Sequence, residues 1–219
     1  MTGAPVNIRA LAGRFPRGQM RSYAWGKFAT DPLYDAVYHA LVGHDAPLLD
    51  IGCGMGLCSF YLHARGMSSP MLGIDTDAAK IDIAKRVAAA HAPALQFATA
   101  DARATLPTHS GNVTILDVLQ YLDADGQITL LRQAAARVAP GGRLVIRTSL
   151  DAHSWRFTLS RLGDWIAAMT RWTYAPVHYP HAETILSTLA TAGLRGTIRP
   201  LWGRTPFNNW LAVFERERN

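Results

Sequence analysis

An acidic residue followed by three alternating glycines is the feature of this chain best suited to chemistry. Asp50 precedes Gly52, Gly54 and Gly56, with an apolar run before them and a helical pattern that begins at Leu57. A strand, a glycine-rich turn and a helix bring backbone N–H groups to the edge of a cofactor, with no Cβ atom to block its approach. The dinucleotide-binding fingerprint requires its third glycine where this chain has Leu57, so the spacing favours another cofactor.

Three further acids fall at the ends of expected strands. Asp75 ends the second strand, Asp101 follows the third and Asp117 ends the fourth. Ligands of open α/β sheets bind outside the carboxyl ends of the strands, which places these acids near the glycine turn. An acid at Asp75 can accept hydrogen bonds from ribose hydroxyls, as it would for NAD. A helix cap shared with Asp77, and a solvated turn at Asp101, are the structural alternatives.

Short apolar runs alternate with helical patterns from about residue 46, which is typical of a parallel α/β sheet. We expect strands at 47–50, 70–75, 95–98, 113–117, 143–147, 195–202 and 208–215. We expect helices that begin at 57 and that cover 77–90, 125–138, 153–170 and 181–193. The sequence therefore predicts an α/β fold: a Rossmann-like, seven-stranded, mostly parallel sheet with a terminal antiparallel hairpin and helices on both faces.

The composition predicts a single globular domain. The chain has 219 residues, of which 49% are hydrophobic, and contains no run of 18 apolar residues that could span a membrane. We expect residues 1–45 to form a helical prefix packed on the carboxyl edge of the sheet, and residues 46–219 to form the main domain. The prefix lacks the apolar segment of a secretory signal, and Gly13, Pro16 and Gly18 interrupt any amphipathic transit helix.

Two cysteines and a basic charge bear on location and partners. Cys53 lies in the glycine turn and Cys58 just after it, where they are poorly placed for a disulfide, which favours a reducing, cytoplasmic compartment. Two thiols do not form a zinc site by themselves, so no metal is expected. The net charge of +6 is compatible with nucleic acid, anionic lipid or an acidic protein, and does not choose among them.

The acid and the Gly-x-Gly-x-Gly turn resemble motif I of class I S-adenosylmethionine-dependent methyltransferases. The resemblance implies that Asp50 orients the cofactor's ammonium group beside the glycine turn, and that Asp75 holds the ribose. It implies that Asp101 meets the adenine amino group and that the backbone N–H of Ala102 meets a ring nitrogen. The cofactor-binding residues that it implies are Asp50, Gly52, Gly54, Gly56, Asp75, Asp101, Ala102, Asp117 and Leu119.

The segment after the fourth expected strand resembles motif IV of the small-molecule methyltransferases. Asp117-Val118-Leu119-Gln120 would run beneath the sulfonium, with Leu119 or Gln120 along the methionine arm. The segment lacks the Asp-Pro-Pro-Tyr type of sequence with which base-methylating enzymes hold a flipped base, and no cysteine lies near it. A small-molecule acceptor is therefore favoured. An RNA-directed enzyme and a catalytically inactive member of the fold are the alternatives.

Methyl transfer is an in-line displacement for which the protein supplies positioning and, for a hydroxyl acceptor, a base. His153 and His178 follow the fifth strand and are the candidate catalytic bases, because histidine suits proton removal near neutral pH. O-methylation without a metal is the expected reaction.

A second, looser resemblance concerns the acceptor. The segment Leu116 to Leu122, together with Ile146-Arg147-Thr148 and Trp155-Arg156-Phe157, resembles methyltransferases of bacterial aryl-polyene pigment clusters. That resemblance implies a phenolic acceptor carried on an acyl carrier protein. Carrier proteins are acidic, and the basic prefix would suit such a partner.

Overall fold

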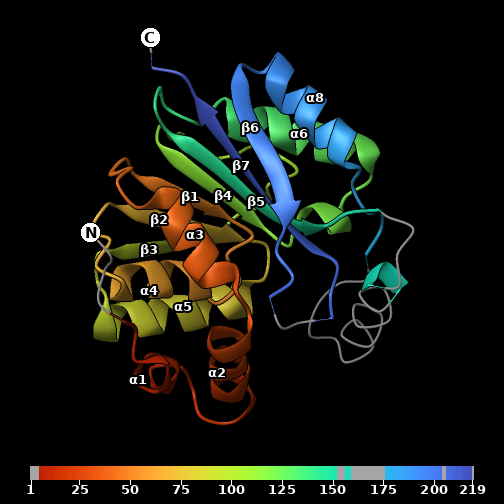
Figure 1. Ribbon diagram of the computed structural model, residues 1–219. Helices are drawn as coiled ribbons and strands as arrows, with labels where there is room; N and C mark the ends of the chain where they lie inside the picture. The colour runs from red at the N-terminus through yellow and green to blue at the C-terminus, as the bar shows by residue number, and fades with distance from the viewer. Residues whose placement is uncertain (1–4, 152–155, 159–175, 204–205, 219) are drawn as a thin grey trace.

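The computed structural model describes residues 5–151, 156–158, 176–203 and 206–218. Within these ranges seven strands form one sheet in the order β3-β2-β1-β4-β5-β7-β6 (Figure 1). The strands are β1 (Leu48–Ile51), β2 (Met71–Asp75), β3 (Leu95–Thr99), β4 (Asn112–Leu116), β5 (Arg143–Ser149), β6 (Leu194–Pro200) and β7 (Asn209–Arg216). The first five strands pair in parallel, whereas β7 runs antiparallel to both β5 and β6. The predicted fold class is confirmed.

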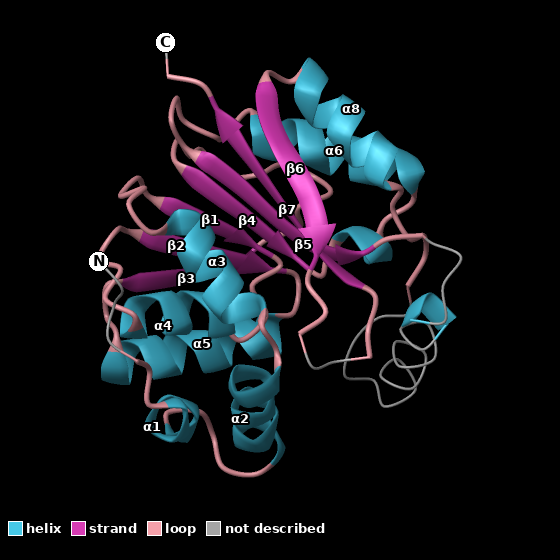
Figure 2. Cartoon of the chain, in the orientation of Figure 1, coloured by secondary structure: helices cyan, strands magenta, loops and turns pink. Residues whose placement is uncertain are grey.

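Helices cover both faces of this sheet (Figure 2). They are α1 (Ile8–Gly13), α2 (Gln19–Thr30), α3 (Leu33–Leu41), α4 (Leu57–Ala64), α5 (Ala78–His91), α6 (Ala124–Ala135) and α8 (Ala182–Thr191), with a 3-10 turn η1 (Leu119–Tyr121). One apolar core packs the five helices from α1 through α5 against one face of the sheet. A second core packs α6 and α8 against the other face. Alternate residues of β1 show the division, because Leu48 belongs to the first core and Leu49 to the second.

Local chemistry sets the ends of several elements. The Asp77 side chain accepts hydrogen bonds from the N–H groups of Ala79 and Lys80, which makes it the N-cap predicted for the second helix of the domain. Gly141 has a φ of 73°, as expected for a left-handed turn between a helix and a strand. Helix α6 ends at Ala135 and not at Val138, because Val138 instead pairs with Gly111 in an isolated β-bridge. Most of the helix expected at 153–170 lies outside the described residues.

The N-terminal helices lie against the first apolar core. Helix α3 buries Leu33, Tyr34 and Val37 and packs beside α4 and β5. Helix α2 and the turn after it reach the carboxyl ends of the strands, where Lys27 and Asp31 line a cleft. The helical character of the prefix is thus present, while the division of the chain at residue 46 stays a prediction.

The order of the strands determines where a ligand can bind. Strand β1 lies between β2 and β4, so the connections from β1 and β4 leave the sheet toward opposite sides. This reversal opens a crevice at the carboxyl ends of the strands, which is the usual ligand site of such sheets. Of the helices in the described ranges, none is both long and apolar enough to cross a bilayer.

Candidate active site

A cleft of about 920 Å³ opens at the carboxyl ends of β1, β2, β4 and β5. Its size is within the range of small-molecule and cofactor sites. Seven of the predicted cofactor-binding residues line it, and two do not. Those that line it are Asp50, Gly52, Gly54, Asp75, Asp101, Ala102 and Asp117. The structure thus gathers most of the predicted set around one cavity.

The glycine turn needs its glycines for close packing as well as for conformation. A Cβ atom on Gly52, which has a φ of 73°, would lie 2.2 Å from the Cγ2 atom of Val118. A Cβ atom on Gly56, with a φ of 76°, would lie 2.5 Å from the ring of Phe97. Gly56 therefore shapes the turn from behind and does not line the cleft. The turn and the segment after β4 meet at Gly52, which brings the two predicted motifs together.

Asp50 is a buried acid with an unsatisfied oxygen. Its side chain is 1% exposed, and its Oδ1 atom accepts a hydrogen bond of 2.6 Å from the hydroxyl of Thr114. Its Oδ2 atom is buried and has no hydrogen-bond partner. Burial, with a smaller effect of the charge on Asp75, raises the pKa of Asp50 to about 7 despite the hydrogen bond from Thr114. A cationic group bound in the cleft beside Asp50 would stabilise its carboxylate form.

The acids after β2 and β3 lie farther along the cleft. Asp75 accepts hydrogen bonds of 2.8 Å from the backbone N–H groups of Gly54 and Asp77, so it holds the glycine turn while it faces the cavity. Asp101 forms an exposed ion pair with Arg103, and hydrogen bonds from Arg103 are the main cause of its lowered pKa. Both carboxylates line the cleft, where each could accept further hydrogen bonds.

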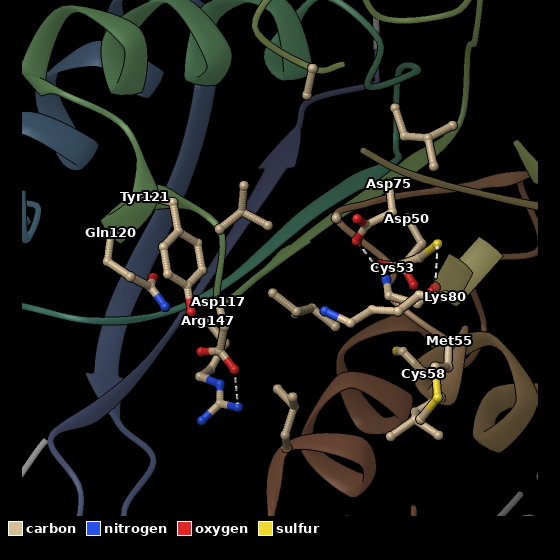
Figure 3. A pocket seen from close by; sticks show the side chains of 18 of the residues that line it. Asp50, Cys53, Met55, Cys58, Asp75, Lys80, Asp117, Gln120, Tyr121 and Arg147 are labelled. Atoms are coloured by element: carbon tan, nitrogen blue, oxygen red, sulfur yellow. Dashed lines mark hydrogen bonds and ion pairs between the residues drawn. The ribbon is translucent and has the colours of Figure 1, made fainter. Parts of the chain in front are cut away.

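The segment after β4 requires one correction. Leu119 is fully buried in the second apolar core, because η1 turns its side chain toward the sheet and α6, and it does not line the cleft. Gln120 and Tyr121 line the cleft instead. Figure 3 shows these two side chains beside Asp117, across the cavity from Asp50 and Asp75. Of the two residues expected along the methionine arm, only Gln120 reaches the cavity.

A buried cluster of charges joins Asp117, which the sequence predicted for the cleft, to residues that no motif brings together with it. The Arg147 side chain, only 4% exposed, forms ion pairs with Asp117 and with Asp31, the latter at 3.2 Å. Lys27 pairs with Asp31 at 2.8 Å. Burial disfavours the charged form of Asp31, but Arg147 and Lys27 outweigh it and lower the pKa of Asp31. Members of this cluster are up to 120 positions apart in sequence, and no motif links them.

Of the two predicted histidine bases, the structure describes only His178. His153 lies outside the described residues. The backbone of His178 is fixed near the cleft, since its N–H donates to Gln120 and its carbonyl accepts from Gln127. Its ring lies 5.9 Å from that of His181, and His178 is not among the residues that line the cavity. The catalytic role of both histidines stays a prediction.

Comparison with known proteins relates part of the chain to methyltransferases. Residues 48–142 match the family model of the methyltransferase domain. Over 137 residues the chain is 31% identical to a trans-aconitate 2-methyltransferase of Methylobacterium radiotolerans, a match that covers 59% of this chain and 50% of that protein. The match therefore spans half the length of this curated relative.

Solved structures agree on the fold. An O-methyltransferase family protein from Burkholderia thailandensis has a TM-score of 0.65 at 22% identity, covering 92% of this chain and 61% of that chain. The N-methyltransferase NodS from Bradyrhizobium japonicum has a TM-score of 0.60 at 20% identity, covering 84% of this chain and 94% of that chain. The matched domain and these likenesses show that the chain has the fold of the class I S-adenosylmethionine-dependent methyltransferases, which its sequence resembles.

The residues at the cleft fit the cofactor of this class. S-adenosylmethionine carries an ammonium group and a sulfonium, and the unpartnered Oδ2 atom of Asp50 is a buried acceptor for a cation. The glycine turn presents Gly54 to the cavity, where an added Cβ would meet only the side chain of Lys80 at 3.9 Å. In the described part of the chain, no three His, Cys, Asp or Glu side chains are grouped closely enough to hold a metal ion.

Proposed function

We propose that this chain transfers the methyl group of S-adenosylmethionine to an oxygen of a small-molecule acceptor. The observation that carries the proposal is the cleft at the reversal of the strand order, which is lined both by Asp50, whose Oδ2 atom has no partner, and by the glycine turn. A buried carboxylate without a partner is costly, and a cationic ligand removes that cost. The matched methyltransferase domain supports S-adenosylmethionine as that cationic ligand.

Each acid has a proposed role toward the cofactor. Asp50 would bind the ammonium group, and Asp75 would accept hydrogen bonds from the ribose hydroxyls. Asp101 would receive the adenine amino group, with the backbone N–H of Ala102 beside a ring nitrogen. The bound sulfonium supplies an electrophilic methyl group and a neutral thioether as leaving group. The protein then has to align the acceptor and manage its proton.

The acceptor end of the cleft supports a ligand with an apolar body. Tyr23, Val177 and Phe207 line the cleft and are 36%, 66% and 40% exposed. Apolar side chains left open at the mouth of a cavity are typical of a binding site for an apolar ligand. A phenolic or other hydroxyl acceptor fits this mouth. The named relative acts on trans-aconitate, which makes small organic acids a second group to test.

Two finer proposals concern the setting of the reaction. The basic residues of the prefix, including the exposed Arg9 and Arg17, would suit an acidic acyl carrier protein that delivers the acceptor in pigment-type biosynthesis. The free thiols of Cys53 and Cys58 suit a reducing compartment such as the cytoplasm. A carrier-bound phenol should then be methylated with a lower KM than the same phenol free in solution.

The first experiment is calorimetric titration of the chain with S-adenosylhomocysteine, with NAD as the control. Micromolar binding of S-adenosylhomocysteine alone supports the cofactor assignment. Transfer of labelled methyl groups to hydroxyl acceptors, free and carrier-bound, then tests the reaction. Binding of S-adenosylhomocysteine without transfer to any acceptor would favour an inactive member of the fold, and binding of NAD alone would contradict the proposal.

A further inference from the structure

Asp117 has the least common backbone conformation in the described part of the chain. Its φ is 59°, and no other non-glycine residue in the described ranges has a positive φ. Asp and Asn adopt this left-handed conformation more readily than other residues, and such residues are frequent at functional sites. Asp117 directly follows β4 and lines the cleft with about a third of its side chain exposed. The turn thus presents a carboxylate to the cavity.

Arg147 holds Asp117 at two points. The backbone N–H of Asp117 donates to the carbonyl of Arg147 at 2.8 Å, and the guanidinium forms an ion pair with the Asp117 carboxylate. The same Nη2 atom of Arg147 donates to Asp31, which Lys27 also binds. A carboxylate fixed through both its backbone and its side chain has little freedom to change orientation. Asp117 therefore has the rigid support expected of a reacting group.

The position of Asp117 relative to the glycine turn decides which ligand it meets. Its neighbour Val118 packs so closely on Gly52 that a Cβ atom there would lie 2.2 Å from Val118. Figure 3 shows Asp117 with Gln120 and Tyr121 on one side of the cavity and Asp50, Cys53 and Asp75 on the other. A cofactor held by Asp50 and Asp75 would therefore have Asp117 across the cavity from it. An acceptor that approaches the cofactor from that side of the cavity would meet the Asp117 carboxylate.

We infer that Asp117 binds the acceptor hydroxyl and receives its proton, rather than binding the cofactor, and that Arg147 positions it. The inference rests on the proposed O-methylation. As the acceptor oxygen forms its bond to the methyl carbon, the bond from that carbon to sulfur breaks and its electron pair stays on sulfur. The hydroxyl proton moves to a carboxylate oxygen of Asp117 and later passes to solvent. Because the attacking oxygen becomes strongly acidic as it bonds to carbon, a carboxylate is a sufficient base.

The test compares Asp117→Asn with the wild type on two phenols. Asparagine has the same shape and tolerates a positive φ, so the variant should fold. With 4-ethylphenol, a weak acid, we expect kcat to fall about 100-fold or more. With 4-nitrophenol at pH 9, where the phenol is already ionised, we expect a loss below about tenfold, since no proton has to be removed. Asp82→Asn, on the exposed side of α5, is the matched control and should keep wild-type rates.

Three outcomes separate the roles. Affinity for S-adenosylhomocysteine within about threefold of the wild type, with the unequal loss on the two phenols, supports the inference. A fall in that affinity, or an equal loss on both phenols, would overturn it and return Asp117 to a cofactor-binding or structural role. If the wild type binds S-adenosylhomocysteine and methylates no hydroxyl acceptor, the proposed function itself fails.

Arg147→Lys tests the positioning role. Lysine keeps the positive charge but loses the planar fork that joins Asp31 and Asp117. We expect kcat on 4-ethylphenol to fall about tenfold while KM changes little, because the carboxylate is still charged but less well aligned. The pH profile of kcat should keep its shape. An unchanged kcat would contradict the assignment of Arg147 as the positioning residue.

Discussion

The two halves of the cleft are built in different ways. The proposed cofactor half consists of the glycine turn and the acids at the carboxyl ends of β1, β2 and β3, and each group there is placed by its own strand end. The acceptor half depends on Arg147 from β5, which joins the end of β4 to the turn after α2. The side chains of the first half are positioned by residues near them in sequence. Those of the second half are positioned by contacts between segments that are distant in sequence. Substitutions in the second half should therefore affect folding as well as chemistry.

The largest expected effect is on stability, from Arg147→Met. The change leaves Asp31, which is 8% exposed, without its Arg147 partner and removes the ion pair of Asp117. Loss of one partner of a buried ion pair costs about 3–5 kcal/mol of unfolding free energy. Urea unfolding measures it. The matched change in the cofactor half is Arg103→Met, whose pair with Asp101 is exposed and should cost less than about 1 kcal/mol. An equal loss of unfolding free energy in the two variants would contradict the proposed difference between the two halves of the cleft.

The second prediction concerns the pH dependence of stability through Asp50. Its pKa of about 7 in the folded chain lies above the value of about 4 for an unfolded aspartate. The folded state therefore binds more protons between pH 4 and 7, and the unfolding free energy should fall as pH rises through this window. The integrated effect is on the order of 3–4 kcal/mol. Urea unfolding at pH 5 and pH 8, without cofactor, should show this slope, and Asp50→Asn should remove it.

Ligand binding gives the same residue a second test. Binding of S-adenosylhomocysteine, which carries the ammonium group, should favour the charged form of Asp50 and release close to one proton near pH 6. Calorimetry in buffers of different ionisation enthalpy measures this release. If no proton is released, or if Asp50→Asn releases as many as the wild type, Asp50 does not contact the cation.

Asp75→Ala should have a smaller effect, confined to the cofactor half. The change removes the proposed ribose contacts and the hydrogen bond to the backbone N–H of Gly54. We expect affinity for S-adenosylhomocysteine to fall about 10- to 100-fold, equivalent to about 1.4–2.8 kcal/mol. Asp77→Asn, which keeps the N-cap of α5, is the control and should bind as the wild type does. An unchanged affinity in Asp75→Ala would remove the assigned role.

Asp101→Ala is expected to have the smallest effect. Asp101 is partly exposed and its pair with the exposed Arg103 is local, so the unfolding free energy should change by less than about 1 kcal/mol. Affinity for S-adenosylhomocysteine should fall up to about tenfold, since one hydrogen bond to the adenine amino group is lost. Affinity for a ligand that lacks the adenine, such as methionine, should not change. A fall in affinity for both ligands would show that Asp101 does not act through the adenine.

Much of the fold could be predicted from the sequence, because the signals are local. Each strand of the parallel part is a short apolar run, and Asp77 and Gly141 mark element ends by well-known capping rules. The predicted end of α6 was wrong for a tertiary reason, since Val138 pairs with Gly111 in a β-bridge and does not continue the helix. Leu119 failed as a cleft residue for a similar reason, because η1 turns it into the core.

The sequence alone predicted the fold of this protein and most of the residues that line the proposed cofactor half of the cleft. Asp50, the glycine turn and the acids that follow are spaced along single strand-turn-helix units, whose geometry holds wherever those units fold. Only the tertiary structure decided the acceptor half. Lys27, Asp31, Asp117 and Arg147 meet because α2, β4 and β5 converge on one cleft. Ion pairs between residues 116 positions apart, such as Asp31 and Arg147, leave no periodic pattern in the sequence, since the packing of the elements alone sets the distance between them.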